Sequence, residues 1–308
     1  MTRPPLKNVG HSVRTRLTDQ ARARGENAQL VMTRFAIERL LYRLSQSVYR
    51  ETFILKGAML FSLWTPTPFR ATGDLDLLGF GDAAPARMAD VFRDVCALVV
   101  EDDGTHFDPT SVAAEAARAD DEYSGVRVTL IATIAGARLP IQVDIGFGDV
   151  VTPAATAIAY PSLLGFPEAR LRAYPPETVV AEKLEALVSL GMRNSRMKDL
   201  FDLWAIGNTF AFKGVVLAQA VGSTFSQRRT PILHEPPIAL TDDFTNDPGK
   251  QAQWRAFIGR TSIALAPAPL PELMAFLRVF LLPLLQQDAA LALTGAAWAP
   301  SGPWTSQS

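Results

Sequence analysis

The stretch "RATGDLDLLGF", residues 70–80, places Asp74 and Asp76 two positions apart at the start of an apolar run. A glycine precedes the pair, and the length of the run is typical of a short buried strand. Side chains alternate across a strand, so Asp74 and Asp76 share one face while Leu75 and Leu77 point into the core. Two like charges this close need a cation nearby, and a divalent ion with oxygen ligands suits them.

A third carboxylate comes from a predicted hairpin downstream. Residues 123–134 and 137–148 are strand-like apolar segments separated by two residues, which favours an antiparallel hairpin. Asp144 lies in the second of these segments. If that strand pairs beside the first, Asp144 joins Asp74 and Asp76 at one edge, which is the layout of a two-metal phosphoryl-transfer site.

A structural interpretation of the aspartate pair stays open at this point. Asp74 would then cap the turn after Gly73, and Asp76 would be a half-exposed strand residue. Two aspartates in this spacing are common in proteins, so the pair alone does not decide between the two roles.

The segment just upstream favours a phosphate site. In "LKGAM", residues 55–59, a short apolar strand ends at Lys56 and Gly57, and a helical pattern begins. The free N–H groups at the start of a helix can hold an anion. A glycine there lets a phosphate approach the main chain, and Lys56 adds positive charge.

The composition narrows the class of protein. The chain has 308 residues, 48% hydrophobic and 20% charged, which predicts a globular protein of two or three lobes. Its single cysteine excludes a disulfide framework and a cysteine-rich zinc site, and fits a reducing cytoplasm. We expect no signal peptide and no membrane span, because no apolar stretch of about 18 residues occurs. The P-loop pattern GxxxxGK[ST] and the HExxH pattern are both absent from the sequence.

Hydrophobic periodicity predicts four segments. They are an N-terminal helical arm over residues 1–50, an α/β core over 51–160, a helical domain over 161–300 and a loose tail over 301–308. A Pro-, Thr- and Asp-rich stretch between about 225 and 250 indicates a surface loop within the helical domain.

The predicted arm is basic. Residues 1–50 carry ten Lys or Arg against three acidic residues, a local net charge of +7, and the rest of the chain carries −8. Arginines such as Arg34, Arg39 and Arg43 would form either a phosphate-facing surface or the solvated face of an amphipathic helix. Charge alone favours the solvated face slightly.

Two helical segments in the second half carry further candidates. In "PETVVAEKLEALVSL" the apolar spacing predicts a buried stripe with Lys183 at its margin. In "SRMKDLFDLWAIG" Asp199 and Asp202 share one helix face. The structural interpretation is a surface ion pair of Lys198 with Asp202, worth about 0.3–0.5 kcal/mol. These residues alone favour that interpretation.

The combined motifs resemble a known superfamily. A strand, a Gly-small pair, a short helix, a D-x-D strand and a distant third aspartate resemble the nucleotidyltransferases related to DNA polymerase β. More narrowly, "FILKGAMLFSLW", "FRATGDLDLLGF" and "VVAEKLEALVSLGMRNSRMKDLFDLW" occur in an order similar to that of the AbiEii/AbiGii toxin family. These are nucleotidyltransferase-like toxins of abortive-infection and toxin–antitoxin systems, and include the MenT-type toxins. The resemblance covers about residues 30–210.

The resemblance implies an α+β fold, with a polymerase-β-like core and mixed sheet between the helical arm and the C-terminal helical domain. It also implies a cytoplasmic, Mg²⁺-dependent enzyme with a two-metal site that moves a nucleotidyl group from an NTP to an acceptor. The acceptor of the MenT-type relatives is the 3′ end of tRNA. The implied partner is an antitoxin, often a winged-helix DNA-binding protein.

The resemblance also implies roles for individual residues. Asp74, Asp76 and Asp144 would bind the metal ions, with Asp144 also activating the acceptor hydroxyl. The implied nucleotide-binding residues are Lys56, Gly57, Ala58, Arg70 and Lys183. Asp199 would orient Lys183 or the acceptor, whereas Asp202 and Lys198 would support the helix. Ala58 departs from the usual Ser of the superfamily, so one hydroxyl contact to phosphate is missing.

Two other classes of function remain open from the sequence. A nucleotidyltransferase acting on a small molecule such as an aminoglycoside or a sugar would use the same carboxylates, and would confer drug resistance without growth arrest. A non-catalytic interaction protein on the same fold would show no Mg²⁺-dependent NTP binding.

Overall fold

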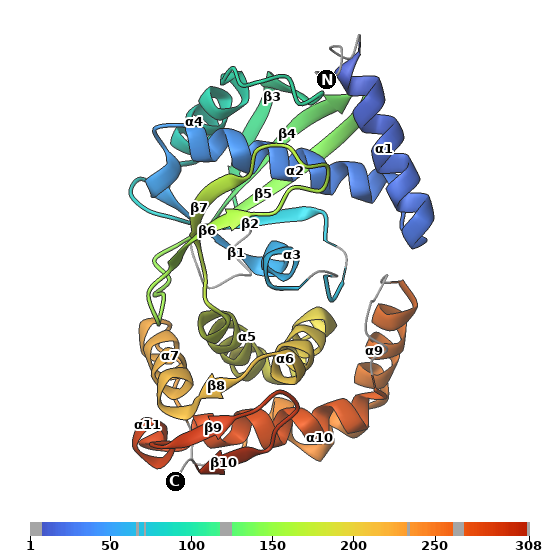
Figure 1. The fold of residues 1–308 in the computed structure, drawn as a ribbon. Coiled ribbons are helices and arrows are strands. Elements are labelled where there is room, and N and C mark those ends of the chain that lie inside the picture. The colour runs from blue at the N-terminus through green and yellow to red at the C-terminus, as the bar shows by residue number, and fades with distance from the viewer. Residues whose placement is uncertain are drawn as a thin grey trace. The chain divides into compact units, whose positions relative to one another are not determined.

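The structure is a computed structural model that describes residues 8–65, 68–70, 72–117, 125–232, 235–260 and 268–306. The chain forms two compact units (Figure 1). One comprises Met1–Gly148 and Thr156–Ala173, and the other comprises Asp149–Ala155 and Tyr174–Ser308.

The predicted segment boundaries need correction. The basic segment 1–50 is not a separate arm, because its two helices pack within the first unit. That unit also extends beyond the predicted limit at residue 160, since a further strand returns to its sheet before Ala173.

Within the described residues, the first unit is built on a seven-stranded sheet in the order β3-β4-β5-β2-β1-β7-β6. β2 is parallel to β5, and β1 is parallel to β7, whereas the other neighbours are antiparallel. The predicted mixed sheet is therefore confirmed. The strands are β1 (Phe53–Lys56), β2 (Asp74–Gly79), β3 (His106–Ala116), β4 (Gly125–Ile134), β5 (Ala137–Phe147), β6 (Thr156–Tyr160) and β7 (Ala169–Ala173).

Helices α2 and α4 pack against the sheet and contact each other (Figure 1). A short turn, η2, follows β1 and leads into α3, as the "LKGAM" pattern predicts. The helical elements of this unit are α1 (Val9–Arg24), α2 (Ala28–Gln46), η1 (Arg50–Thr52), η2 (Gly57–Met59), α3 (Leu60–Trp64) and α4 (Pro85–Ala97).

The arginines of α2 contradict the solvated-face interpretation, because α2 is a core helix. Arg34, Arg39 and Arg43 are only 6%, 0% and 6% exposed. Arg39 Nη2 lies 2.6 Å from Glu38 Oε1, and Arg43 Nη1 lies 2.7 Å from Asp103 Oδ2. Removing one partner of such a buried pair costs about 3–5 kcal/mol, because the other charge is left uncompensated. These three arginines of the basic segment therefore stabilise the unit internally.

The second unit is mainly helical within the described residues, as expected for the helical domain predicted over 161–300. Its helical elements are α5 (Pro176–Leu190), η3 (Gly191–Arg193), α6 (Met197–Thr209), α7 (Gly214–Gln227), η4 (Ile238–Leu240), α8 (Asp242–Asn246), α9 (Pro248–Arg260), α10 (Leu270–Leu281), η5 (Leu282–Leu285) and α11 (Ala289–Ala292). A small three-stranded sheet joins β8 (Phe212–Lys213), β9 (Ala296–Trp298) and β10 (Trp304–Ser306). No helix among the described residues is long and apolar enough to cross a membrane.

Two segments that the sequence predicts to be irregular contain regular structure. The surface loop expected between about 225 and 250 includes η4 and α8, where Leu240 and Phe244 are buried. Residues 233 and 234 of that loop lie outside the described residues. The predicted loose tail contains β10, which pairs with β9 because Trp304 packs against Trp298 and Phe280.

Candidate functional site

The three predicted carboxylates lie at matched positions on two neighbouring strands. In the parallel pairing of β2 with β5, Asp76 lies directly opposite Asp144, and Asp74 lies opposite Gln142. Positions opposite one another share a face of the sheet, as do positions two apart. The condition set by the sequence, that the hairpin strand should pair beside the D-x-D strand, is therefore met.

Gly57 allows the main chain after β1 to lie directly against the Asp76 carboxylate. Its φ is +74°, and a Cβ placed there would come within 2.0 Å of Asp76 Oδ2. Only glycine tolerates both this conformation and this approach. Lys56 lies opposite Asp76 in the antiparallel pairing of β1 with β2, so the Asp76 carboxylate is adjacent to both residues of the "KG" pair.

Ala58 and Arg70, two further nucleotide-binding candidates, pack against other residues of the first unit. Ala58 is only 7% exposed, so its methyl group belongs to the core. Arg70 is half-buried, and its Cζ lies 5.9 Å from the centre of the Phe61 ring on α3. Arg70 is thus held beside the helix that follows Gly57.

Arg127 on β4 is a site residue that the sequence analysis missed. Its Nε lies 2.7 Å from Asp144 Oδ1, and its Nη2 lies 3.2 Å from Oδ2. Gln142 Nε2 donates a third hydrogen bond to Oδ2 at 2.8 Å. The hydrogen bond with Asp144 raises the pKa of Arg127 above its ordinary value, and the charges of Asp144 and Asp74 act in the same direction.

The predicted hairpin contained the signal for this pair. A two-residue turn at Ala135 and Gly136 makes partners equidistant from it. Arg127 is eight positions before Ala135 and Asp144 is eight after Gly136, and β4 and β5 pair in this register. Applying the hairpin register to each polar residue would have identified Arg127.

The carboxylates fit a hard divalent cation in ligand type and in strand register. However, no three acidic, histidine or cysteine side chains within the described residues are gathered as a bound metal ion would require. The hydrogen bonds of Asp144 give one physical reason, since both its oxygens already accept them. Metal binding by this group would therefore require Asp144 to exchange Arg127 for the ion. The pair is well placed for this, because the Arg127 and Asp144 side chains are 41% and 33% exposed.

The second unit contains a separate lysine–carboxylate cluster. Lys183 of α5 places Nζ 2.5 Å from Asp199 Oδ1 and 2.9 Å from Asp202 Oδ2, both on α6. The three side chains are 15%, 9% and 0% exposed. The predicted surface pair is wrong, because Lys198 is exposed whereas Asp202 is fully buried beside Lys183. Asp202 therefore does more than support its own helix: it contacts the candidate lysine directly.

Arg228, at the end of α7, anchors the helix that carries Lys183. Its guanidinium lies 2.8 Å from Glu185 Oε2 and 2.8 Å from Asp149 Oδ1. Thr230 donates a further hydrogen bond to Glu185 at 2.6 Å. Because Glu185 is two residues from Lys183 on α5, this network fixes the position of the helix that presents the lysine. No local sequence pattern indicates this network, since its members are far apart along the chain.

The chain is similar to one protein family in sequence and to several solved structures. A sequence model of the nucleotidyl transferase AbiEii toxin, type IV toxin–antitoxin system, matches residues 39–279. Among solved structures, the chain is similar to JHP933 from Helicobacter pylori, with 14% identity and a TM-score of 0.49, over 87% of this chain and 92% of that one. It is also similar to an antigenic nucleotidyltransferase-like protein from Paracoccidioides brasiliensis, with 13% identity and a TM-score of 0.36, over 73% and 88% of the two chains. No curated protein sequence matches the chain.

The family match covers well over half of the chain. It includes β1 and β2 with the "KG" and D-x-D motifs, β5 with Asp144, and the helices that carry Lys183, Asp199 and Asp202. The chain therefore belongs to the AbiEii nucleotidyl transferase toxin family of type IV toxin–antitoxin systems.

Proposed function

We propose that this protein is a Mg²⁺-dependent toxin that transfers a nucleoside monophosphate from an NTP to the 3′ end of tRNA. Membership of the family accounts for nucleotidyl transfer, for an NTP substrate and for an antitoxin partner. The metal, the tRNA acceptor and a winged-helix antitoxin are the parts that we add.

The observation that supports the proposal best is the strand register of the carboxylates. Asp76 and Asp144 are opposite one another on adjacent strands, and Asp74 is on the same face. Such a set is the arrangement with which nucleotidyl transfer is carried out on two metal ions. Gly57 lies against the Asp76 carboxylate, so the main chain that would receive the triphosphate is next to the acidic edge.

The reaction forms a bond between the acceptor hydroxyl oxygen and the α-phosphorus of the NTP. The bond from the α-phosphorus to the oxygen bridging to the β-phosphorus breaks, and pyrophosphate leaves with the electron pair. When bound, the divalent ions would stabilise the charge on the phosphates. We assign the Asp144 carboxylate to accept the proton of the acceptor hydroxyl.

The remaining candidates would hold the substrates. The N–H groups that follow Gly57 would bind the triphosphate, with Lys56 and Arg70 adding charge. Lys183 would pair with phosphate charge, and Asp199 would orient the lysine amine. This assignment has support in the direct contact of Lys183 with both aspartates of α6.

A transfer assay tests the acceptor and the carboxylates together. Purified protein is incubated with each labelled NTP, Mg²⁺ and total tRNA, and label is followed in RNA, in protein and in small molecules. We expect label in tRNA, dependent on Mg²⁺. Asp76→Asn should reduce transfer by at least about a hundredfold, because one metal-binding carboxylate is lost.

Asp90→Asn is the matched control. Asp90 is an exposed aspartate of α4 whose surface pair with Arg93 is expected to contribute little. This control should transfer at the wild-type rate. Label in a protein band or a small molecule would contradict the tRNA acceptor, and full activity of Asp76→Asn would contradict the metal assignment.

A further inference from the structure

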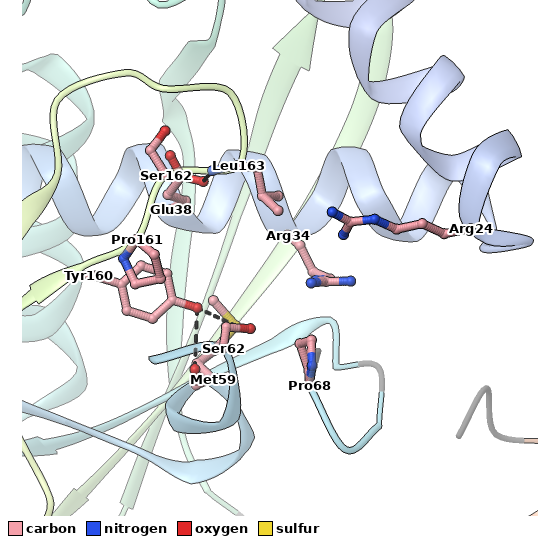
Figure 2. A pocket seen from close by; sticks show the side chains of 10 residues that line it. All are labelled: Arg24, Arg34, Glu38, Met59, Ser62, Pro68, Tyr160, Pro161, Ser162 and Leu163. Carbon is pink, nitrogen blue, oxygen red and sulfur yellow. Dashed lines mark hydrogen bonds between the residues drawn. The ribbon is translucent and has the colours of Figure 1, made fainter. Parts of the chain in front are cut away.

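A cavity of about 240 Å³ lies in the first unit, and its described lining does not include the three carboxylates of the chain's motifs. Figure 2 shows side chains from α1, α2, η2, α3 and the segment after β6 around it. Two of them are cationic, Arg24 near the end of α1 and Arg34 on α2. None of the functional candidates from the family motifs lines this cavity.

Arg34 is a buried guanidinium with unused donors. Its side chain is only 7% exposed, and within the described residues it makes one hydrogen bond, from Nη1 to Glu26 Oε2 at 3.0 Å. A guanidinium has five N–H donors in a planar fork. Glu26 already pairs with the charge of Arg34, but that pair occupies a single donor, so the other donors of this cavity-lining guanidinium are suited to a second anion.

Arg24 supplies a second cation from another helix. Figure 2 shows the Arg24 side chain reaching toward the region of Arg34. The acidic side chain that lines the cavity, Glu38, is already neutralised, since it accepts from Arg39 at 2.6 Å and from the Leu163 N–H at 2.8 Å. The charge presented to a ligand is therefore positive.

The rest of the lining suits a small polar body. The Tyr160 hydroxyl is fixed by donating to the Met59 carbonyl oxygen at 3.2 Å. Burial raises the pKa of Tyr160 to about 12, and a hydrogen bond from Ser62 acts in the opposite direction. These groups and the nearby Pro161 ring offer a mixed polar and apolar wall.

We propose that this cavity binds a phosphate monoester of a sugar or of a single nucleoside, with the phosphate between Arg24 and Arg34. A phosphate monoester carries a charge of about −1.5 to −2 and has three acceptor oxygens, so it can pair with both guanidiniums. A carboxylate carries a single charge, which one guanidinium already balances. The cavity volume of about 240 Å³ is below the about 300–1,000 Å³ usual for drug-sized ligands, so we expect it to take a small monoester.

The cavity is connected to the catalytic motifs by chain continuity. Met59 lines it, and Met59 ends the η2 turn that begins at Gly57 beside Asp76. A bound ligand would thus stabilise the turn against which the Asp76 carboxylate lies. The binding itself does not depend on nucleotidyl transfer.

Calorimetric titration of the full chain without divalent ions tests the proposal. The probes are ribose 5-phosphate, AMP and inorganic phosphate, with adenosine as the probe that lacks the phosphate. We expect the two monoesters to bind more tightly than inorganic phosphate, and adenosine to give no saturable binding. Arg24→Gln should weaken monoester binding by about fivefold and Arg34→Gln by at least about tenfold.

Three variants make the result specific. Arg22→Gln is the control for Arg24, since it changes an exposed arginine on the same helix and should bind as the wild type does. Ser62→Phe leaves both arginines in place and fills the cavity, so binding should be lost even if Arg34→Gln disturbs folding. Asp76→Asn should bind the monoesters normally, although it loses nucleotidyl transfer.

Absence of saturable binding by the wild type would overturn the proposal. Normal binding by Ser62→Phe would also overturn it, because the ligand would then be elsewhere. Loss of binding in Asp76→Asn would assign the monoester to the catalytic edge instead. Failure of the transfer assay with intact, Ser62-dependent binding would contradict the proposed function alone.

Discussion

At the scale of single residues, Arg127 is in an unusual position for a strand arginine. It pairs with Asp144, and the charge of Asp74 also acts on it, at the edge where we propose that divalent ions bind. An arginine there can act in two opposite ways. It can orient Asp144 for the metal, or it can occupy the place of a metal ion until one arrives.

We predict that Arg127→Gln binds Mn²⁺ about tenfold more tightly than the wild type in the absence of nucleotide. Removing the positive charge that pairs with Asp144 and acts on Asp74 changes the attraction for a divalent cation about 4–8 Å away by about 1–2 kcal/mol at the dielectric constant of bulk water. Titration followed by the electron paramagnetic resonance of free Mn²⁺ measures this affinity. Arg93→Gln, which removes an exposed arginine of α4, is the control and should not change it. Weaker Mn²⁺ binding by Arg127→Gln would mean that the arginine orients the carboxylate for the ion.

Sequence patterns predict some of these residues and not others. The face that Asp74 and Asp76 share and the strand that carries Asp144 follow from strand alternation and a two-residue hairpin, which are local rules. The parallel pairing of β2 with β5 that brings Asp144 opposite Asp76 does not follow from them. The burial of Arg43 does not follow from such rules, because its partner Asp103 is 60 positions away. Helical periodicity could not distinguish a solvated arginine from one neutralised by a distant carboxylate.

At the scale of secondary structure elements, β10 shows how a short polar segment becomes ordered. It pairs with β9, and the Trp304 indole N–H donates to the Phe280 carbonyl oxygen at 3.0 Å. The Trp304 ring stacks on Phe280 and meets Trp298 edge-on. Its Ser-, Gly- and Pro-rich surroundings indicated a loose tail because the sequence does not show which rings Trp304 contacts.

We predict that Trp304→Ala lowers the free energy of unfolding by about 2 kcal/mol, since a half-buried aromatic ring and its contacts are lost. Trp304→Phe is the matched variant, because it keeps a ring and loses the indole N–H. It should cost about 1 kcal/mol, the contribution of one hydrogen bond. Urea denaturation followed by circular dichroism gives both values. An unfolding midpoint unchanged by Trp304→Ala would mean that β10 does not contribute to the second unit.

Elements with strong periodicity or clear turns are the ones that the sequence predicts. The β4–β5 hairpin matches its predicted residues 123–134 and 137–148 closely, and β2 begins at the predicted Asp74. β3 was missed because Pro109 and a register shift between Asp108 and Ala113 interrupt its alternation. The short β7 was missed because it pairs in parallel with β1, a contact between distant segments.

At the scale of the whole molecule, the candidate residues are divided between two units. The carboxylates that we assign to metal ions belong to the first unit, whereas Lys183 and its aspartates belong to the second. The predicted limit of the core at residue 160 fell short because β7 returns to the sheet after an intervening loop. If both clusters serve one reaction, a change in the second unit should stop transfer without affecting the metal site of the first.

Lys183→Gln tests whether the lysine cluster of the second unit is needed for transfer but not for metal binding. We predict that it reduces nucleotidyl transfer and growth arrest by at least about a hundredfold, because an amine that pairs with phosphate charge is lost. Its Mn²⁺ affinity in the absence of nucleotide should stay within about twofold of the wild type, because Lys183 pairs with Asp199 and Asp202 and not with the carboxylates that we assign to the ion. Since Asp199 and Asp202 lose a buried partner, the free energy of unfolding should fall by about 3–5 kcal/mol, and transfer must be normalised to the folded fraction measured by circular dichroism.

Lys198→Gln is the matched control, because Lys198 is an exposed lysine next to Asp199. It should retain both transfer and Mn²⁺ binding. Full transfer by folded Lys183→Gln would show that the lysine cluster only stabilises the second unit, and a loss of Mn²⁺ binding would show that the two clusters are not separable.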